Sequence, residues 1–128
     1  MGGFILPSPR TINGMATPLA QRHCEVCTPE TPTLPPAEID RLLGQLSGWS
    51  VVEGDGHLQL TKTFKFKGFM LGVELINRIA PIAEAEGHHP DLHLSYGSVR
   101  VDLWTHAAGG LTENDFILAA KIDDIQPA

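Results

Sequence analysis

The stretch HLQLTKTFKFKGFMLGVELINRIAPIAEAEG, residues 57–87, contains the change in hydrophobic pattern that decides the fold. In its first part, Leu58, Leu60, Phe64 and Phe66 alternate with polar residues, which is typical of a half-buried strand. Over residues 69–86 the apolar residues recur at helical spacing, and the glycine at 87 is suited to end a helix. A proline at 81 is expected to kink this helix or to free one carbonyl. The stretch therefore predicts a strand followed directly by a long helix.

The flanking sequence predicts one helix and one strand upstream, and two strands and one helix downstream. We expect a helix over 36–47, a strand beginning at 49, a turn at 54–56, strands near 92–96 and over 99–106, and a last helix capped by Thr112. The order is α-β-β-α-β-β-α. Two hairpins joined through a helix favour an α+β fold in which a four-stranded antiparallel sheet carries the helices on one face.

Composition limits the possible partners. The chain has 128 residues, of which 42% are hydrophobic and 19% charged, and its net charge is −6. This length suits one folded domain. No apolar run approaches the roughly 20 residues of a membrane helix, and a negative chain is a poor partner for a nucleic-acid backbone. We therefore expect a cytoplasmic protein that contacts neither a membrane nor nucleic acid directly.

Residues 1–36 differ in composition from the rest of the chain. They hold seven of the ten prolines and no sustained hydrophobic period, so we interpret them as a flexible Pro/Thr-rich arm before a domain at 37–128. Deleting residues 1–34 is expected to leave stability nearly unchanged. The arm has no acidic residue before Glu25, so an organellar transit segment is the alternative location signal. Cys24 and Cys27 lack the second pair of a zinc knuckle and are interpreted as inert thiols.

Histidines cluster in the second half of the chain. Four of the six fall within nineteen residues: His88, His89, His93 and His106. Histidine can give and take protons near neutral pH. Pro90 restricts His89 to an extended backbone, so the rings of His88 and His89 should point to different sides of one cavity. The last strand should bring His106 there, beside Trp104.

Two other interpretations of this cluster remain open. His-His-Pro is often a polar loop without a site. A metal site is the second alternative, but Pro90 prevents the helix that the spacing between His89 and His93 would need, and no carboxylate completes a known ligand pattern. We expect His93 to face solvent or to pack at the start of its strand.

The spacing of seven residues resembles the motif of the pterin-4a-carbinolamine dehydratase family: Glu84, His88, His89, Pro90, Tyr96, His106 and Asp115. The stretch from Thr105 to Asp115 is also similar to the last strand and turn of that family. The resemblance covers residues 37–128. It departs from the family at Leu92-His93, where many members carry Trp-Phe, so the rim of the pocket should differ.

The resemblance implies an enzyme that dehydrates 4a-hydroxytetrahydropterin to quinonoid dihydropterin, in tetrahydrobiopterin recycling, by histidine acid–base catalysis with no metal or other cofactor. It implies that His88 and His106 transfer protons and that His89 orients the substrate, with the acid and the base left unassigned. The implied substrate contacts are made by backbone groups of four residues: Pro90, Thr105, Ala107 and Ala108. We expect Glu84 to support His88, and Asp115 to cap the last helix or support the site.

The same resemblance implies a homo-oligomer, either a tetramer or a dimer. A small domain with one uncovered sheet face and exposed edge strands gives an independent reason for this expectation. A different class of function is a non-enzymatic protein on the same fold, either a dimerisation partner of a transcription factor or an assembly chaperone. The chaperone-like relatives lack the histidine trio that this chain keeps, which favours catalysis.

Overall fold

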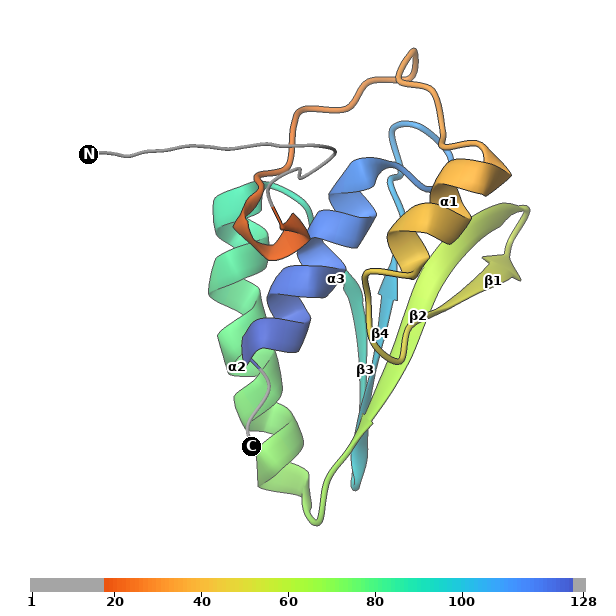
Figure 1. Cartoon of the computed structure of the whole chain (residues 1–128). Coiled ribbons are helices and arrows are strands. Elements are labelled where there is room, and N and C mark those ends of the chain that lie inside the picture. Colours follow the sequence, from red (N-terminus) through yellow and green to blue (C-terminus); the bar gives the residue numbers. More distant parts are fainter. Residues whose placement is uncertain (1–17, 126–128) are drawn as a thin grey trace.

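In the computed structural model, which describes residues 18–125, a four-stranded antiparallel sheet lies beneath three α-helices that share one of its faces (Figure 1). The strands are β1 (Ser50–Gly54), β2 (His57–Lys65), β3 (Asp91–Ser95) and β4 (Ser98–Leu103), in the order β1-β2-β4-β3. The helices are α1 (Pro36–Leu43), α2 (Phe69–Glu86) and α3 (Glu113–Ile125), preceded by a 3-10 turn η1 (Leu19–Gln21). The predicted α+β fold is confirmed.

Helix α2 has the bounds that its hydrophobic period predicts, and it continues through Pro81. It ends at Gly87, which adopts the left-handed conformation at φ 66° that a glycine reaches without steric cost. The N–H of His88 donates to the carbonyl of Ala83 at 3.2 Å, which closes the last turn. This sharp end fixes the point at which the His-His-Pro loop leaves the helix.

Strand β4 lies between β2 and β3 and places Val99, Val101 and Leu103 in the core, each fully buried. The strand ends at Leu103, three residues earlier than predicted. Beyond it, the carbonyl of Thr105 accepts hydrogen bonds from the N–H groups of residues 108, 109 and 110, so the chain turns back on itself. The predicted alternation still continues into this turn, since Thr105 is buried and His106 is exposed.

Smaller differences from the prediction are local. Helix α1 ends at Leu43, and Gly44 follows it, rather than continuing to residue 47. The turn between β1 and β2 places both Asp55 and Gly56 at positive φ, as the tightest hairpin turns require. None of the helices in residues 18–125 is long and apolar enough to cross a membrane.

Residues 18–35, which were predicted to belong to a flexible arm, lie against the domain. Leu19 is only 4% exposed and belongs to the hydrophobic core. The Lys121 ammonium donates to the carbonyl of Ala20 at 2.8 Å, and the N–H of Leu34 donates to the carbonyl of Leu111 at 2.9 Å. The segment is mostly extended, and isolated apolar residues hold it to the domain. Its hydrophobic residues therefore do not recur at helix or strand spacing, and its sequence pattern resembles that of a linker. Residues 1–17 of the predicted arm lie outside the described residues.

Candidate active site

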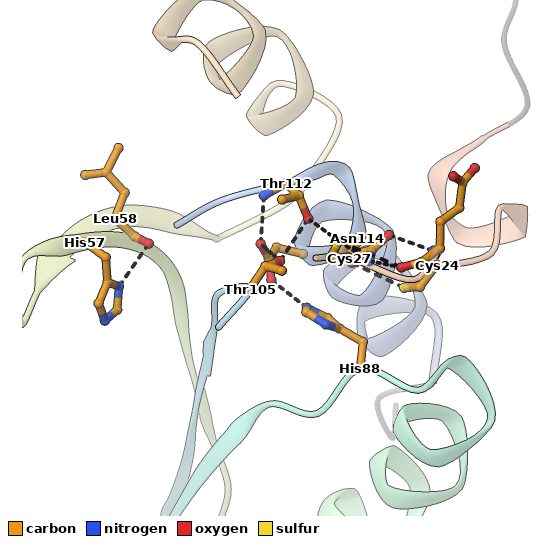
Figure 2. Close-up of polar contacts among 10 residues, drawn as sticks. Cys24, Cys27, His57, Leu58, His88, Thr105, Thr112 and Asn114 are labelled. Atoms are coloured by element: carbon orange, nitrogen blue, oxygen red, sulfur yellow. Dashed lines mark hydrogen bonds and ion pairs between the residues drawn. The ribbon is translucent and has the colours of Figure 1, made fainter. Parts of the chain in front are cut away.

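The loop after α2, the turn after β4 and the first turn of α3 meet at a cavity of about 440 Å³. His88, His89 and His106 all line it, and so does Trp104. The structure therefore brings together the three predicted histidines beside an aromatic side chain. Figure 2 shows His88 projecting from the loop after α2 toward Thr105 and Thr112.

A buried carboxylate holds the ring of His88. Its Nε2 lies 2.6 Å from Oδ1 of Asp115, and the two side chains are 11% and 0% exposed. The other oxygen of Asp115 accepts two hydrogen bonds at 2.9 Å, from the Thr105 hydroxyl and from the N–H of Thr112. The Thr112 hydroxyl lies 2.8 Å from the Thr105 hydroxyl and completes the chain (Figure 2).

This network determines which nitrogen of the His88 ring is left as a hydrogen-bond acceptor. A carboxylate accepts hydrogen bonds and does not donate them, so Nε2 of His88 carries the proton that faces Asp115. The neutral ring then presents Nδ1 as its acceptor. The pair resembles the carboxylate–histidine pair of hydrolase triads, in which the carboxylate fixes the tautomer and stabilises the imidazolium, but here the carboxylate contacts Nε2 instead of Nδ1.

Asp115 also caps α3, as the sequence predicts. Its bond to the N–H of Thr112 is one half of a capping box. The Thr112 hydroxyl does not complete the box, because it faces Thr105. Sequence spacing alone does not reveal the second role of Asp115, since 27 residues separate it from His88.

Glu84 contacts a different histidine from the one expected. Its Oε1 lies 2.8 Å from Nε2 of His89, whereas His88 pairs with Asp115. The cause is Gly87, which ends the helix before His88 can take the next helical position over Glu84. The side chains of Glu84 and His89 are 80% and 62% exposed, and an ion pair this open to solvent contributes little to stability. His89 therefore lies at the rim of the cavity.

His106 belongs to a stack of three rings. Its imidazole lies 3.8 Å from the Trp104 ring, and the imidazole of His57 lies 3.5 Å from Trp104, nearly parallel to it at 13°. His57, which begins β2, was not among the predicted site residues. The pairing of β2 with β4 contains the signal: Leu60 lies opposite Leu103, so continuing the register places residue 57 opposite residue 106 on the same face.

The other predicted positions divide into two groups. Pro90, Thr105 and Ala107 line the cavity, whereas Ala108 lies in the adjoining turn, where its N–H donates to the carbonyl of Thr105 at 3.2 Å. Two motif or cluster residues lie away from the cavity: His93, which is half-exposed with Nε2 3.3 Å from Asp102, and Tyr96, which is 76% exposed.

The cysteines lie close to this site as free thiols. Burial raises the pKa of Cys24 to about 12, and the carboxylates of Glu86 and Asp115 add to the effect. This thiol stays protonated at neutral pH and is a poor nucleophile. Within residues 18–125, no group of three or more His, Cys, Asp or Glu side chains is placed to hold a metal ion.

Comparison with known proteins connects this geometry to one family. A pterin-4-alpha-carbinolamine dehydratase of Rickettsia bellii is 48% identical over 108 residues, which is 84% of this chain and 94% of that protein. A relative from Saccharophagus degradans with the same name is 43% identical over 85% of this chain and 96% of its own length. The mitochondrial pterin-4-alpha-carbinolamine dehydratase 2 of Arabidopsis thaliana is 50% identical over 66% of this chain and 46% of its length.

Solved structures give the same result for the fold. A transcriptional coactivator/pterin dehydratase from Brucella melitensis superimposes with a TM-score of 0.68 at 36% identity, over 74% of this chain and 99% of that one. A pterin dehydratase-like RuBisCO assembly factor of the alpha-carboxysome shares the fold, with a TM-score of 0.53 at 19% identity, over 64% and 93% of the two chains. The pattern of the family described as Pterin 4 alpha carbinolamine dehydratase matches residues 32–125. The predicted family is thus confirmed: the chain belongs to the pterin-4-alpha-carbinolamine dehydratase family, a family of lyases.

Proposed function

We propose that this protein dehydrates 4a-hydroxytetrahydropterin to quinonoid dihydropterin. The observation that carries the proposal is the His88–Asp115 pair, at 2.6 Å, in the same cavity as His89 and His106. A fully buried carboxylate behind a histidine at the wall of a cavity is suited to proton transfer.

The reaction needs two proton transfers and no change of oxidation state. The bond between C4a and its hydroxyl oxygen breaks, and an acid supplies the proton with which that oxygen leaves as water. A base removes the proton from N5, and the electron pair of the N5–H bond forms the C4a=N5 double bond. Histidine is suited to both tasks, and such proton transfer typically contributes about 10²–10⁴-fold in rate.

We assign the base to His88 and the acid to His106. Nδ1 of His88 is the nitrogen left to accept the N5 proton, and Asp115 stabilises the imidazolium that forms. His106 is exposed, so after it protonates the leaving hydroxyl it can recover a proton from solvent. His89, at the rim, orients the pterin. Backbone groups of Pro90 and Ala107 contact it, while Thr105 and Ala108 shape the turn through their own hydrogen bonds.

The test is a direct assay with chemically generated 4a-hydroxytetrahydropterin, followed by ultraviolet absorbance with and without the protein. We expect the protein to accelerate dehydration, and the acceleration to persist after dialysis against a metal chelator. No acceleration would contradict the proposed function and favour the non-enzymatic alternative on this fold. Activity that disappears with chelation and returns with zinc would favour a metal-dependent hydrolase.

The proposed metabolic role of the reaction is the recycling of tetrahydrobiopterin, and its proposed location is the cytoplasm. An aromatic amino-acid hydroxylase leaves its tetrahydropterin with a hydroxyl on C4a, so an enzyme of that class would supply the substrate. An organelle is the alternative location, and the Arabidopsis thaliana relative, which is named mitochondrial, supports it.

We further propose that the protein is a homo-oligomer, with a tetramer expected and a dimer as the second choice. Strands β1 and β3 are the edges of the sheet, and several large apolar side chains are exposed near β3 and the start of α2: Phe69, Met70, Leu71, Leu94 and Tyr96. Exposed apolar side chains beside an unpaired edge favour association. Light scattering coupled to size exclusion should show a mass near two or four times 13.8 kDa. A single active species at the mass of one chain would contradict this expectation.

A further inference from the structure

Residues 22–27, here called the strap, precede the part of the chain that matches the family pattern, which begins at residue 32. The strap nevertheless lies beside the candidate active site. Figure 2 shows Cys24 and Cys27 next to Asn114, in the first turn of α3. The residue that follows Asn114 is Asp115, which holds His88.

Asn114 fastens the strap to α3 through both ends of its side-chain amide. Its Oδ1 accepts the N–H of Glu25 at 3.0 Å, and its Nδ2 donates to the carbonyl of Glu25 at 2.7 Å. The same Nδ2 lies 3.3 Å from Sγ of Cys27. Asn114 is only 6% exposed, so little water can replace these bonds. An ion pair of 2.5 Å between Arg22 and Glu113 adds a second link to the same turn.

Glu86 fastens the strap to the end of α2. Its Oε1 accepts the N–H of Cys24 at 2.7 Å, and its Oε2 lies 2.8 Å from Nδ1 of His23. Burial acts to raise the pKa of Glu86, but the Cys24 N–H, His23 and Lys121 outweigh it and hold the pKa below its ordinary value of 4.5. Glu86 is two residues before His88. The strap thus joins the two helix ends that carry the His88–Asp115 pair.

The strap also forms part of the cavity wall. Glu25, Val26 and Cys27 line the same cavity as His88 and His106. Val26 is 94% exposed, so its side chain is almost free of packing contacts with the rest of residues 18–125. An exposed apolar side chain at the edge of a pocket is available to cover a flat, partly apolar ligand.

We propose that the strap forms one wall of the pterin-binding pocket, where Val26 contacts the bound pterin. Asn114 is the positioning residue that holds both the strap and the His88–Asp115 pair in place. The inference rests on the proposed function, because it takes the ligand of the cavity to be a pterin. It adds to that function a specificity element that precedes residues 32–125, the part of the chain matched by the family pattern.

Two variants and a matched control test the proposal: Asn114→Ala, Val26→Asp and Asn77→Ala. Asn77 is exposed on α2, so Asn77→Ala makes the same chemical change away from the cavity. The readouts are kcat, KM, the pH profile of kcat/KM, the Kd of 7,8-dihydropterin by calorimetry, and the melting temperature. The assay of the unaltered protein comes first.

For Val26→Asp we expect KM and Kd to rise about tenfold, the loss of one good apolar contact, with kcat and melting temperature unchanged. For Asn114→Ala we expect KM to rise and kcat to fall, each by about tenfold, because three side-chain hydrogen bonds to the strap are lost beside Asp115. The limb of its pH profile that reports His88 should also shift. Asn77→Ala should behave like the unaltered protein.

The outcomes separate the two proposals. An inactive unaltered protein overturns the proposed function, and this inference with it. An active protein whose Val26→Asp variant keeps its KM and Kd overturns the inference alone. An Asn114→Ala variant that has a lower melting temperature but unchanged kcat, KM and pH profile also overturns the inference. If Asn114→Ala fails to fold, Val26→Asp still decides, because its side chain takes no part in the core.

Discussion

Replacing His88 or His106 with alanine is expected to slow dehydration of 4a-hydroxytetrahydropterin by about 10²–10⁴-fold, the usual contribution of a positioned acid or base. Each variant removes one of the two proposed proton-transfer groups. The measurement is kcat/KM by ultraviolet absorbance. His93→Ala is the matched control, because His93 is half-exposed beside Asp102 and does not line the cavity; it should keep its activity.

The two variants should differ in stability. His106 is exposed, and among the described residues its ring contact is with Trp104, at 3.8 Å, so His106→Ala should cost about 1 kcal/mol, the value of one ring pair. His88→Ala removes a hydrogen-bond partner from fully buried Asp115, which typically costs about 1–3 kcal/mol. Circular dichroism during thermal unfolding measures both, and both variants should remain folded at 25 °C.

The pH profiles distinguish the base from the acid. A base must be unprotonated to act, so it sets the acidic limb of the profile, and the acid sets the alkaline limb. His88→Ala should therefore remove the acidic limb, and His106→Ala the alkaline limb. The reverse pattern would exchange the two assignments, and full activity in either variant would show that the pair is wrongly chosen.

Local signals predicted the element that positions the site. The hydrophobic period of residues 69–86 and the glycine that follows them gave α2 its bounds, because a helix period and a left-handed cap are both encoded within a few residues. The end of α2 in turn fixes where His88 and His89 begin. The convergence of His88, His89 and His106 was predicted from the same loop and from the strand before His106.

The contacts that the sequence did not predict join residues that are far apart in the chain. The bond between His88 and Asp115 joins the end of one helix to the start of another, and no periodic pattern records that approach. His57 reaches Trp104 only through the register between β2 and β4. Residues 18–35 were interpreted as part of a linker because the residues that anchor them, Leu19 and Leu34, are isolated apolar residues among prolines and polar residues. In each case tertiary packing, and not local propensity, decides the contact.

Deleting residues 1–34 is expected to lower the melting temperature by roughly 10–20 °C, contrary to what the sequence pattern alone suggests. Burial of a leucine such as Leu19, at 4% exposure, contributes about 1.5–3 kcal/mol. Leaving buried Asn114 without the backbone of Glu25 costs about 1–3 kcal/mol more. Together these losses are a large part of the stability of a small domain.

Deletion of residues 1–17 is the control for this prediction, because it leaves every described contact in place. Leu19→Ala in the full chain isolates the buried anchor and should cost about 2–5 kcal/mol if the site cannot collapse. Differential scanning calorimetry of the three proteins at neutral pH gives the comparison. Equal melting temperatures for the full chain and the 35–128 fragment would show that the packing of residues 18–34 contributes nothing to stability.

The stabilisation from residues 18–34 should also depend on pH, through Glu86. The Cys24 N–H, His23 and Lys121 hold the pKa of Glu86 below 4.5 in the folded protein, against the opposing effect of burial. A carboxyl whose pKa is lowered by folding stabilises the folded state above its unfolded pKa, and that stabilisation is lost as the pH falls through the folded value. Deleting residues 1–34 removes two of the three groups that lower this pKa. The difference in melting temperature between the full chain and the fragment should therefore be largest above pH 4.5 and narrow at lower pH. A difference that stays constant from pH 7 to pH 3 would show that Glu86 takes no part in holding the strap, and that the apolar anchors alone do so.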